Sequence, residues 1–279
     1  MAANSGEQYD RRSNPGIKNE LQEHIEKVIK KMSKLSGKVA IVTGASKGIG
    51  AGIAGKLAQD GAAVVVNYSS SAREAEAVVA GIQKQGGRAS AVQADVSKPG
   101  AAKKLFEAAI REFGTVNVLV NNAGVYQPAP FENVDEGTFD RHFNLNVKGL
   151  FFAIQEAVKL FGDRGGSIIN ISSIASLSPR PNLVVYSATK AAVDAITKGL
   201  AAELGPKKIL VNSVLPGAVD TEGFRAMPGS NDFRTYITSQ TALGRIGQPR
   251  DIANVVSFLA GDEAAWITGQ LISVSGGWS

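Results

Sequence analysis

Short runs of β-branched and aliphatic residues alternate with longer segments of helical periodicity from Lys38 to the end of the chain. Seven such runs stand at 39–42, 63–67, 89–94, 117–121, 167–172, 209–215 and 271–275. Between them, segments such as 49–60, 72–85, 99–113 and 249–260 carry apolar residues at helical spacing. Strands that alternate with helices indicate βαβ units. The pattern therefore predicts an α/β fold with a doubly wound, seven-stranded parallel sheet of the Rossmann type.

The first 36 residues differ from the rest. Residues 1–18 are polar and are expected to form a loose tail. Over 19–34 apolar side chains recur at helical spacing after Asn19, which predicts an amphipathic helix. We expect it to pack on its own domain or on a neighbouring subunit; a helix on a membrane surface or on a partner is the alternative. Residues 37–279 contain no repeat or linker and are predicted to form one Rossmann-type domain.

Composition excludes several classes of protein. Cysteine is absent and the two histidines are His24 and His142, so disulfides, thiolate nucleophiles and a multi-histidine metal centre are excluded, and no metal is expected. The net charge is +5 without a concentrated basic face, so nucleic acid is not an expected partner. No apolar run approaches the roughly 18–20 residues of a membrane span, and the N-terminus resembles no targeting peptide. The expected compartment is the cytoplasm.

The first predicted strand leads directly into TGASKGIG (43–50), which opens a helix. Gly44 permits the tight turn, Gly48 lets the backbone approach a pyrophosphate, and Gly50 lets helix and strand pack closely. The helix N-terminus offers N–H groups and a positive dipole to phosphates. The segment also matches the G-x-S-x-G elbow of hydrolases around Ser46, but no histidine follows His142 to complete such a triad. A dinucleotide site is therefore favoured.

The end of the second predicted strand distinguishes between cofactors. An NAD site has Asp or Glu there to bond the ribose diol. This chain has Asn67, followed by Tyr68 and by Ser69 to Ser71. An amide and hydroxyls can donate to a 2′-phosphate that a carboxylate would repel, and Lys47 adds a cation on the same side. These residues favour NADP(H).

Tyr186 and Lys190 stand at i and i+4, on one face of a predicted helix. An unperturbed phenol titrates near ~10, and a nearby ammonium is expected to lower the pKa of Tyr186. The preceding strand ends at Ser172-Ser173, on the carboxyl edge where ligands bind. We expect Ser173 to meet the tyrosine there, with Ser172 as the alternative.

Taken together, these motifs resemble the short-chain dehydrogenases/reductases over about residues 37–279. They are TGASKGIG (43–50), Asp95 after the third strand, NNAG (121–124), Asn146 in NLNVKG, Ser173 thirteen residues before Tyr186, Lys190, and PGAVDT (216–221). The chain is most similar to the carbonyl-reducing, NADP-type branch with 3-oxoacyl-[acyl carrier protein] reductases and polyketide or naphthol reductases. The resemblance implies hydride transfer from NADPH to a ketone or aldehyde, either a 3-oxoacyl compound or another small to medium one.

The resemblance also implies roles for individual residues. Tyr186 would be the general acid toward the carbonyl oxygen, and Ser173 would hydrogen-bond that oxygen. Lys190 would hold the nicotinamide ribose and lower the Tyr186 pKa, while Asn146 would anchor a proton-relaying water. From the residues alone, Asn146 could instead bend its helix, and Asn121 could chiefly brace the sheet.

For the cofactor, the resemblance places Asp95 at the adenine amino group and Asn122 and Gly124 along the molecule. Val219 and Thr221 would contact the carboxamide and phosphates. The implied contact residues are Gly44, Ser46, Lys47, Gly48, Ile49, Asn67, Tyr68, Ser69, Asp95, Val96, Asn122, Ala123, Gly124, Tyr186, Lys190, Pro216, Gly217, Val219 and Thr221.

The segment 220–242 corresponds to the substrate lid of the family. Its apolar side chains suit a partly hydrophobic carbonyl compound, or else pack on neighbouring helices; they are Phe224, Met227, Phe233 and Tyr236. Arg164 and Lys207 stand where relatives that use acyl carrier protein have basic residues, which indicates that partner only weakly.

Assembly and two further functions remain open. Apolar faces on predicted helices 135–161 and 185–204 favour a four-helix contact between subunits, and the resemblance implies a homotetramer; inward packing of these faces is the alternative. An NADP-dependent sugar, polyol or secondary-alcohol dehydrogenase is the second enzymatic hypothesis. A cofactor-sensing protein without turnover is the third, and the complete set of Asn146, Ser173, Tyr186 and Lys190 argues against it.

Overall fold

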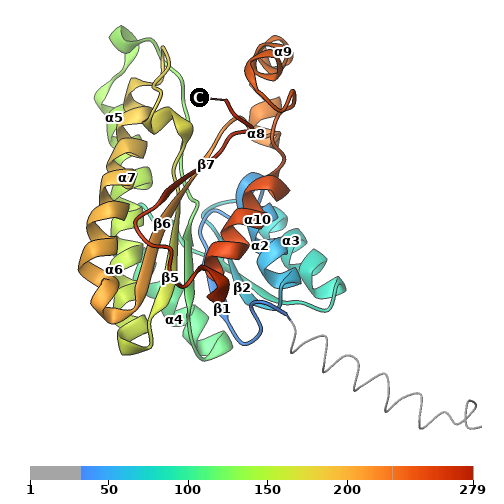
Figure 1. The fold of residues 1–279 in the computed structure, drawn as a ribbon, viewed down its shortest axis with the longest axis vertical. Coiled ribbons are helices and arrows are strands. Elements are labelled where there is room, and N and C mark those ends of the chain that lie inside the picture. Colours follow the sequence, from blue (N-terminus) through green and yellow to red (C-terminus); the bar gives the residue numbers. More distant parts are fainter. Residues whose placement is uncertain (1–32, 228, 279) are drawn as a thin grey trace, which may run out of the picture.

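A computed structural model describes residues 33–227 and 229–278. Within them, one parallel sheet has the strand order β3-β2-β1-β4-β5-β6-β7 (Figure 1). The strands are β1 (Val39–Val42), β2 (Ala63–Tyr68), β3 (Arg88–Gln93), β4 (Val118–Asn121), β5 (Gly166–Ile171), β6 (Ile209–Pro216) and β7 (Leu271–Val274). The predicted doubly wound α/β sheet is confirmed, and each strand boundary lies within one residue of its prediction.

Helices connect the strands and cover the sheet on both faces. The α-helices are α2 (Gly48–Gln59), α3 (Ala72–Lys84), α4 (Ala101–Phe113), α5 (Glu136–Phe143), α6 (Leu150–Phe161), α7 (Val184–Leu204), α8 (Glu222–Arg225), α9 (Ser230–Gln240) and α10 (Pro249–Ala260). The shorter turns are η1 (Phe131–Asn133), η2 (Asn144–Gly149), η3 (Gly162–Arg164), η4 (Ile174–Ser176), η5 (Gly205–Lys207) and η6 (Asp262–Ala264). The helix predicted over 19–34 lies outside the described residues, apart from Ser33 and Lys34, which are not helical.

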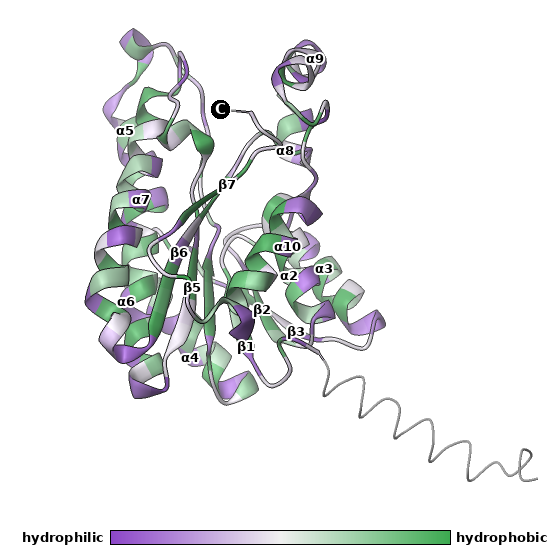
Figure 2. Ribbon diagram, in the orientation of Figure 1, coloured by the Kyte–Doolittle hydropathy of each residue, from purple (hydrophilic) through white to green (hydrophobic). Residues whose placement is uncertain are grey.

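Two apolar cores lie on opposite faces of the sheet. Along β1, Ala40 and Val42 belong to the core beneath α2, α3 and α10, whereas Ile41 belongs to the core beneath α4, α6 and α7. Successive strand residues point to opposite faces, so a strand covered on both faces must be apolar throughout. Figure 2 shows the hydrophobic residues concentrated along the strands.

The chain reverses its winding direction at β1. It first winds outward from β1 through β2 to β3, then returns to place β4 on the other side of β1. At such a switch point the loops after the two neighbouring strands diverge to opposite faces, and ligands bind between them at the carboxyl edge. α8 and α9 stand beyond this same edge (Figure 1).

The helix expected over 135–161 is divided into three parts, which corrects the prediction of one continuous helix. Between α5 and α6 the chain forms the wider π-helical turn η2, which contains Asn146. The turn packs tightly on the segment after β3, since a Cβ on Gly149 would lie 2.8 Å from the Val96 carbonyl oxygen. Such π turns often occur at functional sites.

Part of the apolar surface predicted for assembly faces inward. Leu150, Ile154 and Val193 are buried in the chain's own core, whereas Phe151 and Phe152 of α6 stay exposed. The homotetramer therefore stays a prediction. Within the described residues, no helix is both long and apolar enough to span a membrane.

We predict that Gly50→Ala lowers the free energy of unfolding by about 2 kcal/mol, as overpacking typically does. The new Cβ would lie 2.5 Å from both Asn122 Nδ2 and the Gly44 carbonyl oxygen, so the turn after β1 must move. Gly55→Ala, on the same helix, is the matched control. Beyond its own helix backbone, no atom of the described residues lies within 4 Å of its Cβ, and it should gain about 0.5–1 kcal/mol. Urea denaturation measures both variants, and equal values for them would contradict this account.

Candidate active site

The loops after β1 and β4 are joined by hydrogen bonds of the buried Thr43 and the half-buried Asn122. Thr43 Oγ1 accepts hydrogen bonds from the backbone N–H groups of Asn122 and Ala123, both at 3.0 Å. Asn122 Nδ2 donates in return to the carbonyl oxygens of Thr43 and Gly44, at 2.9 and 3.0 Å. Gly44 has a φ of +61°, and a Cβ there would lie 2.9 Å from Ala123 Cα. The glycine-rich turn is therefore held rigidly in the position predicted for it.

The turn presents the start of α2 to the carboxyl edge. Lys47 is the N-cap residue, with extended backbone and no side chain capping the helix. The first N–H groups of a helix lack intrahelical partners and together form an anion site. Gly48 has a φ of +58°, and a Cβ there would lie 3.3 Å from Thr221 Cγ2, so the turn passes close to Thr221. Ser46 is half-buried here, while Ile49 lines the cavity described below. This cradle fits the pyrophosphate of a dinucleotide.

Asn67 faces the interior rather than the predicted ribose site. It is 1% exposed, and its Oδ1 accepts from the Gly44 N–H at 3.2 Å. Its Nδ2 is directed at the carbonyl oxygens of Tyr68, Val92 and Ala94, at 3.3, 3.2 and 2.9 Å. Both amide protons are therefore committed to the backbone. The prediction that Asn67 donates to a 2′-phosphate is corrected: the residue braces the turn.

The side chains that remain for a 2′-phosphate come from the residues after Asn67. Tyr68 is half-buried at the end of β2, and Ser69 and Ser70 are exposed beyond it. Lys47 is exposed at the neighbouring turn. The feature that favours NADP, the absence of a carboxylate at the end of β2, is unchanged by the new role of Asn67.

Residues that were predicted to contact the cofactor also lie at the carboxyl ends of β3 and β6. After β3, Asp95 Oδ1 accepts from the N–H and the hydroxyl of Ser97, at 3.1 and 2.7 Å, and Val96 is buried. At the end of β6, Pro216 is the last strand residue. Gly217 packs on Ser275, so a Cβ would lie 2.9 Å from the Ser275 Cα.

Val219 and Thr221, in the segment after β6, fix the start of the lid. Val219 forms a parallel bridge with Gly247. Thr221 caps α8, its Oγ1 accepting from the Phe224 N–H at 3.2 Å. These two contacts hold the backbone at the start of the lid in place.

Asn146 connects the π turn to the segment after β4. Its Oδ1 accepts from the Val125 N–H at 2.8 Å, and its Nδ2 donates to the Val125 carbonyl at 3.0 Å and to Thr189 Oγ1 at 3.1 Å. A Cβ on Gly124 would lie 3.2 Å from Asn146 Oδ1 and 3.7 Å from Lys190 Nζ. Asn146, Gly124 and Lys190 thus lie close together.

Tyr186 and Lys190 lie together on α7. The Lys190 ammonium is 5.6 Å from the centre of the Tyr186 ring and donates to the Ile171 carbonyl at 2.8 Å. Burial lowers the pKa of Lys190 to about 8. Burial also raises the pKa of Tyr186 to about 12, against a hydrogen bond from Ser173 that lowers it.

This result corrects the expectation that the pKa of Tyr186 lies below its ordinary value. A lysine with a pKa near 8 loses its charge well before a phenol with a pKa near 12 can ionise. The desolvation of the phenolate is therefore the larger effect in the protein alone. At neutral pH the structure holds a protonated Tyr186 beside a charged Lys190.

The structure distinguishes between the two serines. Ser173 lines the cavity beside Tyr186 and lowers the pKa of that phenol, whereas Ser172 is 3% exposed and donates to the Lys190 carbonyl at 3.2 Å. Ser173 is therefore the serine that faces the cavity.

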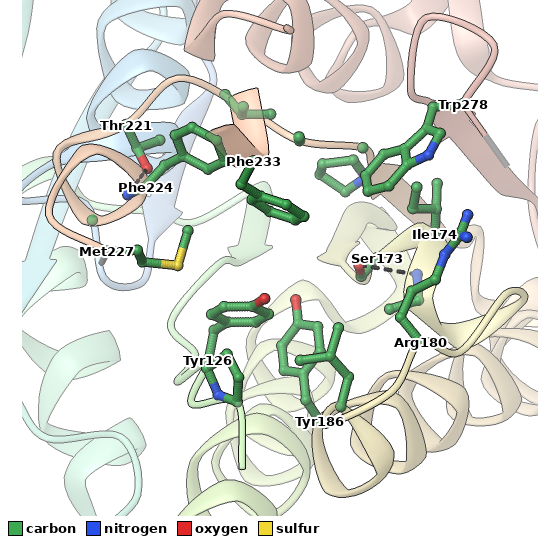
Figure 3. A pocket seen from close by; sticks show the side chains of 18 of the residues that line it. Tyr126, Ser173, Ile174, Arg180, Tyr186, Thr221, Phe224, Met227, Phe233 and Trp278 are labelled. Carbon is green, nitrogen blue, oxygen red and sulfur yellow. Dashed lines mark hydrogen bonds between the residues drawn. The ribbon is translucent and has the colours of Figure 1, made fainter. Parts of the chain in front are cut away.

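A cavity of about 860 Å³ opens above Ser173 and Tyr186 (Figure 3). All four predicted lid side chains line it: Phe224, Met227, Phe233 and Tyr236. Their apolar faces therefore serve the cavity, and Phe224 stacks on Phe233 at 5.9 Å. Arg164 and Lys207 are in η3 and η5 and are not among the residues that line it.

Sequence reasoning missed several residues that line the cavity, among them Tyr126, Arg180 and Trp278. Tyr126 meets the Tyr186 ring edge-on, with ring centres 5.0 Å apart. Arg180 lies over the Trp278 ring at 5.3 Å. Tyr126 and Trp278 lie in the segments that follow strands β4 and β7, and this position at the carboxyl edge was the signal that could have found them. Among the described residues, no group of three or more acidic or histidine side chains is placed to hold a metal ion.

Comparisons with known proteins agree with this geometry. The family profile described as enoyl-(acyl carrier protein) reductase matches residues 44–279. An uncharacterised oxidoreductase of Methylorubrum extorquens is 56% identical over 88% of this chain and 99% of its own length. Versicolorin reductase of Emericella nidulans is 42% identical, covering 88% and 96%. A hydroxynaphthalene reductase-like protein of Metarhizium robertsii is 42% identical, covering 87% and 95%.

Solved structures show the same fold. A short-chain dehydrogenase/reductase of Serratia marcescens matches with a TM-score of 0.83 and 41% identity, over 88% of this chain and 99% of the other. The angucycline C-6 ketoreductase LanV, solved with bound NADP, matches with a TM-score of 0.82 and 40% identity, over 88% and 96%. With the glycine turn, the Tyr186–Lys190 pair and Ser173 at one sheet edge, these matches show that the chain belongs to the short-chain dehydrogenase/reductase family of NAD(P)-dependent oxidoreductases.

Proposed function

We propose that this protein is an NADPH-dependent reductase of ketones carried on fused aromatic rings, with Tyr186 as the proton donor. The observation that carries the proposal is the aromatic wall of the cavity directly above Tyr186 and Ser173. Its members are Tyr126, Phe224, Phe233 and Trp278, which Figure 3 labels, and Tyr236. Flat, rigid rings gain most from such a wall, because aromatic pairs stack or meet edge to face at little cost in entropy.

The size of the cavity supports this substrate class. Ligand sites typically measure roughly 300–1,000 Å³, so about 860 Å³ is near the upper end. Such a cavity can hold the reactive end of a dinucleotide, which would enter beside Ile49 and Val219, together with a bicyclic or larger substrate. A two-carbon or three-carbon carbonyl compound would leave most of the wall unused.

The protonation state of Tyr186 supports reduction. With a pKa near 12, the phenol carries its proton throughout the physiological range and can donate it to a developing alkoxide. Ser173 can hydrogen-bond the same oxygen. NADPH supplies the hydride to the carbonyl carbon; the protein orients the carbonyl and supplies the proton. Oxidation of an alcohol would instead require the phenolate, which burial disfavours.

The relatives support the cofactor and the chemistry. LanV is an angucycline ketoreductase solved with NADP, and two other relatives are named for the reduction of versicolorin and of a hydroxynaphthalene, a bicyclic aromatic compound. The expected homotetramer belongs to the same proposal, because the exposed Phe151 and Phe152 offer a surface that a second copy would cover.

A substrate panel tests the proposed function. We expect kcat/KM for a bicyclic aromatic ketone such as a tetralone or a naphthol tautomer to exceed that for a short 3-oxoacyl thioester by at least about tenfold. That factor corresponds to about 1.4 kcal/mol of stacking. An enoyl thioester and, with NADP⁺, a sugar alcohol complete the panel. The proposed substrate class is wrong if either thioester or the sugar alcohol is the best substrate, and NADPH binding without turnover of any of them would favour a sensor.

Tyr186→Phe should lower kcat by about 10²–10⁴-fold, the usual contribution of a general acid, while the NADPH dissociation constant changes little. Tyr126→Phe is the matched control, because it removes a second phenol whose ring lies 5.0 Å away in the same cavity. The control should lose less than about tenfold. A larger loss in Tyr126→Phe than in Tyr186→Phe would assign the proton donor to Tyr126 instead.

Aspartate substitutions at the adjacent positions 67 and 68 should separate an effect on cofactor choice from an effect on folding. Tyr68→Asp places a carboxylate at the half-buried end of β2, where it would repel a 2′-phosphate, so NADPH affinity should fall more than NADH affinity. Asn67→Asp instead directs a carboxylate at three carbonyl oxygens and should destabilise the fold by roughly 1–3 kcal/mol. Fluorescence titration with both cofactors and urea denaturation measure the two effects. A selective loss of NADPH binding in Asn67→Asp alone would restore the original interpretation of that residue.

A further inference from the structure

Asp194 is a buried carboxylate for which the proposed reaction has no use. It lies on α7, one helical turn after Lys190, and is 6% exposed. Neither of its oxygens has a hydrogen-bond partner among the described residues. An isolated buried carboxylate is costly unless a charge or a donor compensates it. The position of Asp194 therefore requires a partner.

The surroundings of Asp194 contain two cations and two hydroxyls. Lys190 and Lys198 flank it on α7, and both lower its pKa, although less than the hydroxyls of Ser176 and Ser172 do. Those hydroxyls are not free to pair fully with it, because they donate to the carbonyl oxygens of Ser173 and Lys190. Burial nevertheless raises the Asp194 pKa above its ordinary value. Of the two lysines, Lys198 is exposed, so its charge is screened by solvent.

Lys190 is a buried cation, and it in turn requires a negatively charged partner. It is also 6% exposed, and its ammonium donates to a neutral carbonyl oxygen, that of Ile171. Burial lowers its pKa, and Asp194 is the acid that raises it. Two further polar side chains near it among the described residues are Tyr186 on the same helix and Asn146 on η2, across Gly124, and both are neutral at pH 7.

We propose that Asp194 is the buried counter-charge of Lys190 and, through it, a positioning residue of the reduction. The two side chains interact through space across one helical turn rather than by direct contact. Lys190 can stabilise the phenolate left on Tyr186 only while it is charged. Asp194 extends the range of pH over which that charge persists. This inference rests on the proposed function, in which Tyr186 gives up its proton.

The pH dependence of the reaction tests the inference. In the wild type, kcat/KM for ketone reduction should fall as the pH rises through the pKa of Lys190. Asp194→Asn removes the negative charge at constant shape, so this alkaline limb should move down by roughly one pH unit. The NADPH dissociation constant at low pH should stay unchanged. An alkaline limb that stays in place in Asp194→Asn would overturn the proposal.

Two control variants have different expected outcomes. Asp163→Asn makes the same chemical change at an exposed residue of η3, at the opposite end of the sheet, and should not move the limb. Lys198→Gln removes the other cation beside Asp194 and should leave the limb in place or move it upward. A downward shift in either control equal to that of Asp194→Asn would show a general loss of packing and would contradict the specific pairing.

A double-mutant cycle tests the pair without any substrate, so that it can succeed or fail independently of the proposed function. At pH 7, Asp194→Asn should lower the melting temperature of the wild type, because it leaves the Lys190 charge buried alone. In a Lys190→Met background the same change should be neutral or stabilising, because it removes the carboxylate that Lys190→Met leaves unpaired. Equal effects in the two backgrounds would overturn the pairing. Normal coupling without ketone reduction would contradict only the proposed function.

Discussion

All strands of the sheet run in one direction, and every predicted site residue depends on this constraint. The carboxyl ends of β1, β2, β3, β4, β5 and β6 meet at one edge, so segments far apart in the sequence become neighbours there. The loops at that edge must satisfy their backbone polar groups without strand partners. The side chains of Thr43, Asn67 and Asn122 do this, each bonded to the backbone of an adjacent loop. The cofactor cradle is the surface that these hydrogen bonds hold in place.

Beside the cradle, burial controls the chemistry. Tyr186, Lys190 and Asp194 occupy successive turns of α7, and the same desolvation shifts each pKa toward the neutral form of the group. For Tyr186 this keeps the proton that a reductase must donate. For Lys190, desolvation favours loss of the positive charge that the reaction uses, and the nearby carboxylate of Asp194 opposes that loss. The three groups thus form one electrostatic unit, and a change at either end should be measurable at the other.

The fold and much of the site could be predicted from local patterns. The alternation of strands and helices gave the sheet, and the glycines at 44, 48 and 50 gave the cradle, because each responds to short-range geometry. Asn67 was misassigned because β2 is buried on both faces, so its sequence contains no alternation to show which way a side chain points. The π turn at Asn146 and the pKa of Tyr186 depend on packing between distant segments. Tyr126, Arg180 and Trp278 belong to loops without a recognisable motif.

The account rests on the claim that a hydride passes from NADPH to a ketone held against Tyr186. Single-turnover reduction of a bicyclic aromatic ketone with NADPH deuterated at the transferable position of the nicotinamide ring tests it most directly. Mass spectrometry and NMR of the product should show one deuterium on the carbinol carbon and one cofactor oxidised for each alcohol formed. A product without deuterium at that carbon, or cofactor oxidation without alcohol, would contradict the account.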